Sequence, residues 1–222
     1  MQKFHTPAPL TTVIHLPAGR VQVIAADRAD TTVEIRPADP ARSRDTKAAE
    51  QIEVTHGDDG VLRIAAPAAK NQYFGASGAV EITVQLPTGS HVEATAAAAQ
   101  FRTVGRLGHL ALDGAHGPVK IDEAASIRLT AADSDITVGR LTGPAEISTQ
   151  QGDITIGEAL TGTVALSTQK GDITLATAAS AALDAGTSYG RVHNSLKNTE
   201  GSNAALTIRA TTTHGDITAR SL

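Results

Sequence analysis

Apolar and polar residues alternate along most of this chain, in short segments bounded by Pro, Gly or Asp. Alternation with a period of two places successive side chains on opposite faces of a strand, so the pattern predicts β-strands rather than helices. In the first ninety residues it predicts six strands, at residues 12–16, 20–25, 31–36, 51–55, 61–65 and 80–86. Residues 37–50 lack the alternation, and we expect a short helix or a loop there.

Two of the predicted strands end in the same pattern, Leu16-Pro17-Ala18-Gly19 and Leu86-Pro87-Thr88-Gly89. Proline fixes φ at the second position of a turn, and glycine tolerates the conformation that closes it. Both segments are therefore predicted to be corners at which one strand turns into the next.

From Gln100 onward the chain repeats itself with a period of about 18 residues. The clearest copies are Asp135-Ile136-Thr137-Val138, Asp153-Ile154-Thr155-Ile156, Asp172-Ile173-Thr174-Leu175 and Asp216-Ile217-Thr218-Ala219. Three more copies, which begin at Gln100, Pro118 and Arg191, share their phase, and successive copies start 18, 17, 18, 19, 19 and 25 residues apart. A second alternating segment, such as Ala145 to Ile147, lies in most periods.

A unit of this length cannot bury its apolar face alone, whereas stacked copies form a continuous core. The sequence therefore predicts an all-β fold, a β-solenoid resembling a single-stranded β-helix, with about seven C-terminal rungs. Residues such as Ile154 and Ile156 are expected to point inward, and the aspartate and threonine of each copy outward. We divide the chain into an N-terminal β-strand region, 1–92, which forms the first part or cap of the stack, and a repeat region, 93–222, continuous with it.

Composition narrows the range of functions. The 222 residues include 19 Lys and Arg against 23 Asp and Glu, and the basic residues are scattered, which disfavours nucleic-acid binding. The absence of cysteine excludes a disulfide framework, a thiolate zinc site and a cysteine nucleophile. Only five residues are aromatic, three Phe and two Tyr, which argues against a deep small-molecule pocket.

The chain shows no pattern of a secretory signal, and its uncharged stretches are far shorter than the roughly 20 residues that span a bilayer. We expect no membrane insertion and take the cytoplasm as the default compartment.

The two corners, the segment 38–44 and the Gly-Asp-Ile-Thr copies, with Ser188-Tyr189-Gly190-Arg191-Val192 among them, resemble a bacterial β-strand-repeat family of unknown function that is labelled "putative adhesin". Abundant alanine and arginine with little lysine resembles its actinobacterial members. The resemblance covers nearly the whole chain and implies the solenoid fold, but it brings no catalytic residues. Many members resemble anchored envelope proteins, and this sequence departs from them in having no anchor.

Asp135, Asp153 and Asp172 are expected on three consecutive rungs, where they would form an outward ladder of like charges about 4.8 Å apart. Two such charges repel by about 1 kcal/mol in water, so something must offset them. We predict a structural role, in which each carboxylate accepts hydrogen bonds from nearby turn amides. The alternative is calcium, which needs six to eight oxygen ligands, but the glycine-rich nonapeptide of calcium-binding β-rolls is absent. We therefore predict no metal and no cofactor.

Other candidate chemistry is weak. His116 and His214 share one phase but lie too many rungs apart to bind one metal ion. The segment Gly75-Ala76-Ser77-Gly78-Ala79 nearly matches a nucleophile elbow, but its second glycine is one place early and no strand-turn-helix context surrounds it. We predict no catalytic residue.

The leading hypothesis is a non-catalytic interaction or scaffold protein that binds a protein partner or a polysaccharide through its flat face or its loops. Two alternatives stay open: a carbohydrate-active β-helix enzyme, and a cytosolic regulatory partner of an envelope or transport system.

The last copy is followed only by Arg220, Ser221 and Leu222, so we expect the C-terminal rung to be the uncovered end of the stack. We predict an end-to-end homodimer there, with Leu206, Ile208 and Ile217 beneath the joint and Arg220 beside it.

Overall fold

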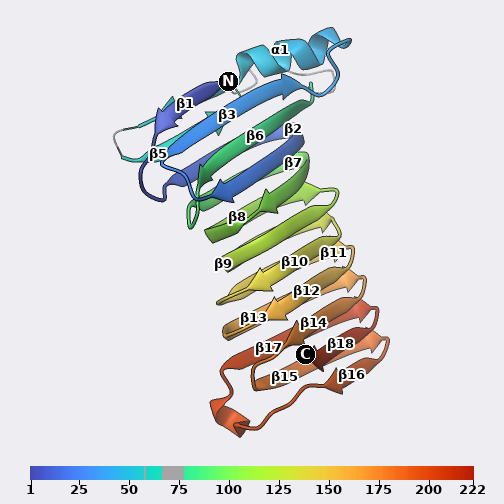
Figure 1. Ribbon diagram of the computed structural model, residues 1–222. Helices are drawn as coiled ribbons and strands as arrows, with labels where there is room; N and C mark the ends of the chain where they lie inside the picture. Colours follow the sequence, from blue (N-terminus) through green and yellow to red (C-terminus); the bar gives the residue numbers. More distant parts are fainter. Residues whose placement is uncertain (58, 67–77) are drawn as a thin grey trace.

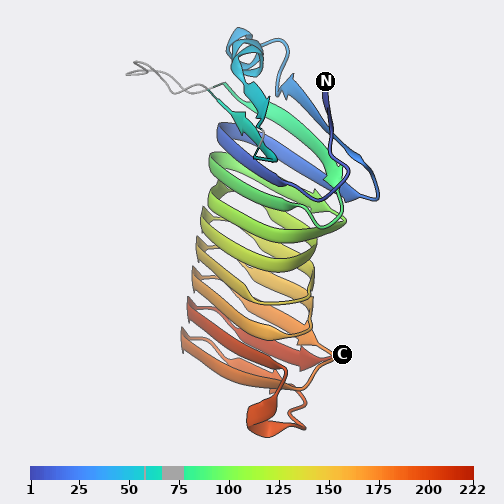
Figure 2. The same ribbon diagram turned by 90° about the vertical axis from the view of Figure 1, so that its left-hand side faces the viewer.

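The computed structural model describes residues 1–57, 59–66 and 78–222. The chain winds into a stack of flattened coils, which we call rungs, with the N-terminal region at one end (Figures 1 and 2). Each rung contributes one strand to each of two facing layers, and the apolar core lies between them. The predicted all-β solenoid is confirmed. The segment 75–79, which nearly matches a nucleophile elbow in sequence, lies mostly outside the described residues.

Three long strands bend partway and take part in both layers, so a single sheet of 18 strands runs through the molecule. They are β2 (Thr11–Ala26), β7 (His91–Val104) and β9 (Val119–Asp133). The predicted division between residues 92 and 93 falls inside β7, so no element boundary separates the two regions.

The first layer begins at the N-terminal end of the stack with β4 (Glu53–His56) and β5 (Val61–Ala65), followed by the first halves of β2 and β7. It continues through β8 (Arg106–His116), the second half of β9, β11 (Ala145–Gln151), β13 (Gly162–Lys170), β17 (Leu206–His214) and β15 (Ala181–Tyr189).

The second layer begins with β1 (Gln2–His5), β3 (Asp30–Pro37) and β6 (Val80–Pro87), followed by the second halves of β2 and β7 and the first half of β9. It continues through β10 (Ile136–Leu141), β12 (Ile154–Ala159), β14 (Ile173–Thr177), β18 (Ile217–Ser221) and β16 (Val192–Ser195). Neighbouring strands of the repeat region are parallel throughout.

Inward residues of successive rungs stack directly on one another. The register places the first apolar residue of all seven predicted copies in one column, and six of the seven are at most 3% exposed. The column runs through Phe101, Val119, Ile136, Ile154, Ile173, Ile217 and Val192. The inward phase predicted from the repeat is therefore confirmed.

The spatial order of the last two rungs differs from their order in the sequence. Strand β17 lies between β13 and β15, and β18 lies between β14 and β16. The C-terminal rung is therefore inserted between the rung of β13 and β14 and the rung of β15 and β16, and the latter ends the stack (Figure 1). Residues 196–205, which include a short 3-10 helix, η1 (Gly201–Asn203), make the return connection.

The prediction that the C-terminal rung is the uncovered end is wrong. Leu206, Ile208 and Ile217 are 1% exposed or less because a rung covers them on each side. The physical reason lies in the inward positions of the two rungs. Ile217 and Ala219 occupy those of β18, whereas Val192 and Asn194 occupy those of β16, so the insertion buries the more apolar rung and leaves the more polar one outside.

The N-terminal end of the stack has a different cover. The segment 37–50, predicted as a short helix or a loop, includes all but the last residue of α1 (Ser43–Gln51), and Ala48, Ala49 and Ile52 pack against the core together with Phe4 from β1. The strands at this end pair antiparallel, β1 with β3, β3 with β6 and β4 with β5. In the described part of the chain, neither helix has the length and apolarity that crossing a bilayer requires.

The two predicted corners behave differently. After β6, Thr88 and Gly89 form a turn, with Gly89 at φ +83°. The segment from Leu16 to Gly19 is not a turn, because β2 continues through it and pairs with β7 on both sides. Glycine is required here by proximity: a Cβ on Gly19, at φ +140°, would lie 1.9 Å from the Val80 carbonyl oxygen.

We predict that the inward column tolerates no charge. Ile154 is fully buried between Ile136 and Ile173, so Ile154→Asp should lower the free energy of unfolding by about 4 kcal/mol or more. Thr155→Asp, on the outward side of the same strand, is the control and should cost less than about 1 kcal/mol. Urea denaturation of both variants measures this. Equal losses in the two would contradict the assigned phase.

Candidate functional site

The aspartate ladder predicted from the repeat lies on the outer side of one corner of the stack, and backbone amides hold it together. The N–H of Asp153 donates to Asp135 Oδ1 at 3.0 Å, and the N–H of Asp172 donates to Asp153 Oδ1 at 2.8 Å. Each carboxylate accepts a hydrogen bond from the next rung, so the ladder links the rungs although its neighbouring carboxylates repel one another.

The ladder is longer than predicted, because the inserted rung adds Asp216. Its N–H donates to Asp172 Oδ1 at 2.7 Å. Arg191 ends the series: its N–H donates to Asp216 Oδ1 and its guanidinium to Oδ2, both at 2.9 Å. The Arg191 N–H, followed by the guanidinium, lowers the pKa of Asp216 below its usual range. A cation therefore compensates the ladder at the uncovered end of the stack.

The same corner explains the glycine before each aspartate, whose carbonyl accepts a hydrogen bond from a buried threonine of the neighbouring rung. Thr168 Oγ1 donates to the Gly152 carbonyl at 3.2 Å, and Thr212 Oγ1 donates to the Gly171 carbonyl at 3.1 Å. Successive glycines approach so closely that a Cβ on Gly171 would lie 2.1 Å from the Gly152 carbonyl oxygen. These contacts give the corner a structural role. Among the described residues no three His, Asp or Glu side chains gather as metal ligands would, and the absence of a metal stays a prediction.

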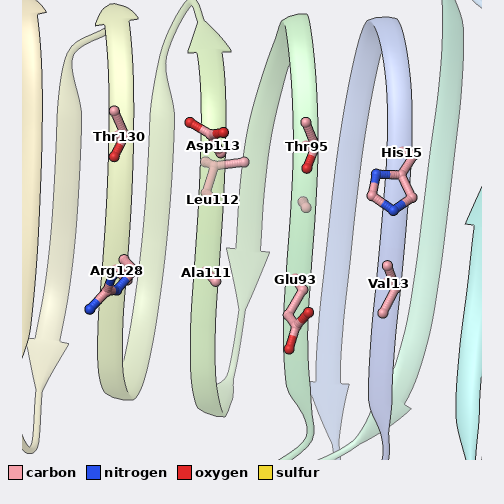
Figure 3. Close-up of a pocket in the computed structure, with 10 residues that line it drawn as sticks. Val13, His15, Glu93, Thr95, Ala111, Leu112, Asp113, Arg128 and Thr130 are labelled. Atoms are coloured by element: carbon pink, nitrogen blue, oxygen red, sulfur yellow. The ribbon is translucent and has the colours of Figure 1, made fainter.

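A shallow groove of about 430 Å³ lies elsewhere, on the outer face of the first layer over β2, β7, β8 and β9 (Figure 3). Two rows of outward side chains cross it from strand to strand. The first row is Val13, Glu93, Ala111 and Arg128, and the second is His15, Thr95, Asp113 and Thr130. We call these eight residues the groove; the buried Ala94 and Leu112 also line it.

Two features of β8 produce the hollow. Ala111 carries a one-carbon side chain between the long Glu93 and Arg128, which leaves space in the first row. Beyond Asp113 the register between β8 and β9 shifts, and Gly114 adopts φ +82°. Such bulges bend a strand and change the direction of the neighbouring side chains. The groove therefore lies where the regular stacking is interrupted.

The groove has an excess of negative charge. Arg128 forms an ion pair at 3.3 Å with Glu146, which lies on the next strand outside the groove. No ion pair involving Glu93 or Asp113 is found among the residues that the structure describes. Both carboxylates are exposed, as are His15 and the two threonines. The arrangement suits reversible polar contacts with a partner's surface.

The groove was not predicted from the sequence. The predicted aspartate ladder lies on a different face, and of the predicted edge residues only Arg220 is exposed, on the second layer between Ala176 and Ser195. The sequence held one sign of the groove. Arg128 and Glu146 occupy the same outward position of two neighbouring rungs, and the equivalent positions of β8 and β7 are Ala111 and Glu93.

We predict that the ladder needs an acceptor oxygen rather than a charge. Asp153→Asn keeps an acceptor for the Asp172 N–H and removes a like charge, so it should change the free energy of unfolding by less than about 0.5 kcal/mol. Asp153→Ala leaves that amide without its partner and should cost about 1 kcal/mol. Chemical denaturation distinguishes them. A calcium-dependent stabilisation of the parent that is lost in Asp153→Asn would show instead that the ladder is a metal site.

Comparison with known proteins agrees with this geometry. The chain has a TM-score of 0.59 and 15% identity to the crystal structure of a Bacteroides fragilis protein described as a "putative adhesin", covering 100% of this chain and 95% of that one. A "putative adhesin" of Parabacteroides distasonis has 14% identity and a TM-score of 0.44, with the same two coverages. The first comparison supports a shared fold.

No curated protein matches the chain. The family model of the Toastrack domain DUF4097 matches residues 13–220, which is nearly the whole sequence. The resemblance to actinobacterial members in particular stays a prediction. The predicted family is confirmed, and the chain belongs to the Toastrack (DUF4097) family.

Proposed function

We propose that this protein is a non-catalytic, adhesin-like interaction protein that binds its partner through the groove. The observation that carries the proposal is the convergence of Glu93, Asp113, Arg128 and His15 on one hollow in an otherwise regular face. The similar fold of the Bacteroides fragilis protein described as a "putative adhesin" agrees with a binding role. The predicted cytoplasmic compartment and a regulatory role beside an envelope or transport system stay predictions.

The lining favours binding over catalysis. A glycoside hydrolase needs a carboxylic acid that stays protonated near neutral pH, and burial is the usual means of achieving this. Glu93 and Asp113 are both exposed. Sugar-cleaving sites also use platforms of Trp, Tyr or Phe, and none of the described lining residues is one of these. The carbohydrate-active enzyme is therefore the weaker alternative.

The charges favour a protein partner over a neutral polysaccharide. A neutral glycan presents hydroxyl groups alone, which leaves the exposed carboxylates of Glu93 and Asp113 without partners of opposite charge. A protein surface presents both signs of charge and can match them, which gives specificity and a fast encounter. The first row extends this charge pattern beyond the groove, since Glu146, Arg209 and Asp184 occupy its later positions.

We predict that filling the hollow abolishes binding. Ala111→Arg places a long side chain between Glu93 and Arg128, and the affinity for the partner should fall at least tenfold. Ala165→Arg is a matched control, because Ala165 lies on the same row between Glu146 and Arg209 but outside the groove. Both variants, immobilised beside the parent, are tested for retention of proteins from the native cell and for binding to a glycan array.

Retention of a protein by the parent and by Ala165→Arg, with loss in Ala111→Arg, supports the proposal. Because charges dominate the groove, this retention should also weaken as salt is raised. If the parent binds a glycan and Ala111→Arg does not, the groove is still the binding site, but the proposal of a protein partner is overturned. Equal retention by both variants would contradict a role for the groove.

A further inference from the structure

We propose that the C-terminal rung, residues 206–222, is exchangeable, and that two copies of this chain form a dimer in which each fills the other's slot. The slot is the space between the rung of β13 and β14 and the rung of β15 and β16. The proposal does not depend on the groove, because it rests on the order of the last rungs.

The inserted rung alone holds the outer rung in place. Strand β15 pairs only with β17, and β16 pairs only with β18, in the part of the sheet that the structure describes. The backbone of Arg191, at the corner between β15 and β16, is likewise bonded to Asp216 of the inserted rung. When residues 206–222 leave, the slot therefore opens, and among the described strands no other pairing holds the outer rung, which stays joined to β14 through residues 178–180.

One connection, residues 196–205, joins the inserted rung to the outer rung. The connection that precedes it is unusually long. From β10 to β15 successive rungs are joined by two or three residues, for example 142–144 and 160–161, whereas residues 196–205 join β16 to β17. Ten residues extend over about 33 Å, far more than the distance between adjacent rungs, so this connection can reach a second molecule.

The connection itself has few bonds to lose. Its backbone bonds to the rungs include Gly162 N–H to the Ala205 carbonyl at 2.9 Å, Ala181 N–H to the Lys197 carbonyl at 3.2 Å, Lys197 N–H to Ser221 Oγ at 2.8 Å and Glu200 N–H to Ser180 Oγ at 3.2 Å. Leu196 is its one large apolar residue, and it is only partly buried. Opening at this end costs less than opening within the stack, since Val192 of the outer rung is already 43% exposed although it occupies an inward position.

Exchange preserves the contacts between the rung and the two strands on each side of it, because an identical segment enters an identical slot. The two forms then differ in their connections and in the entropy of association, which makes the dimer dependent on concentration. Folding also favours exchange at high concentration. The slot is defined by strands that precede residues 206–222, so the same segment of a neighbouring chain competes to fill it.

The absence of native cysteine permits a direct test. Ser167 and Thr211 are register neighbours on β13 and β17, at a spacing that a disulfide bridges. A chain with Ser167→Cys and a chain with Thr211→Cys are unfolded, mixed, refolded at high concentration and oxidised. In the exchanged dimer the two cysteines meet across the slot, so we expect a covalent heterodimer on a non-reducing gel.

Two controls test the specificity of this bridge. In the first, a chain with Ser148→Cys replaces the chain with Ser167→Cys in the mixture. Because Ser148 is one rung further from Thr211, this mixture should give no specific heterodimer. Both substitutions in one chain, refolded at low concentration, should close an intramolecular bridge. A mixture that yields only monomers while the double variant closes its bridge would overturn the exchange. A double variant that folds but forms no bridge would overturn the slot itself.

Discussion

The hydrogen bonds between parallel strands of successive rungs set the distance on which the rest of this structure depends. That spacing, about 4.8 Å, brings equivalent residues of neighbouring rungs into direct contact. An inward side chain must therefore pack against the equivalent side chains of the rungs above and below it, which suits Ile, Val and Ala. At the corner the same spacing brings backbone against backbone, and this is why Gly152, Gly171 and Gly215 each lie against the carbonyl of the rung before.

Much of this could be predicted from the sequence, because each rung repeats the same requirement. The column from Phe101 to Val192 follows from the phase of the Asp-Ile-Thr copies alone. The order of the last two rungs does not, because Val192 and Ile217 both satisfy the same position and a ten-residue connection permits either order. Burial decides between them, and the polar Asn194 in an inward position was the available sign.

Where the repeat is imperfect, the sequence revealed less. Strand β8 was not predicted, because Gly108 and Gly114 interrupt its alternation, and the groove beside it was missed with it. Residues that stabilise this fold, such as the aspartates of the ladder, thus recur regularly in the repeat. The proposed binding site coincides with an interruption, where Ala111 and the bulge after Asp113 leave a hollow among charged side chains.

The central claim, that pairing places the C-terminal rung inside the stack, is tested most directly by amide hydrogen exchange resolved for each strand. Amides of β17 and β18 lie between two rungs, whereas β15 and β16 have a paired strand on one side. The account predicts slower exchange in β17 and β18 than in β15 and β16. Strong protection of β15 and β16, with rapid exchange of β17 and β18, would show that the stack follows the order of the sequence and would contradict it.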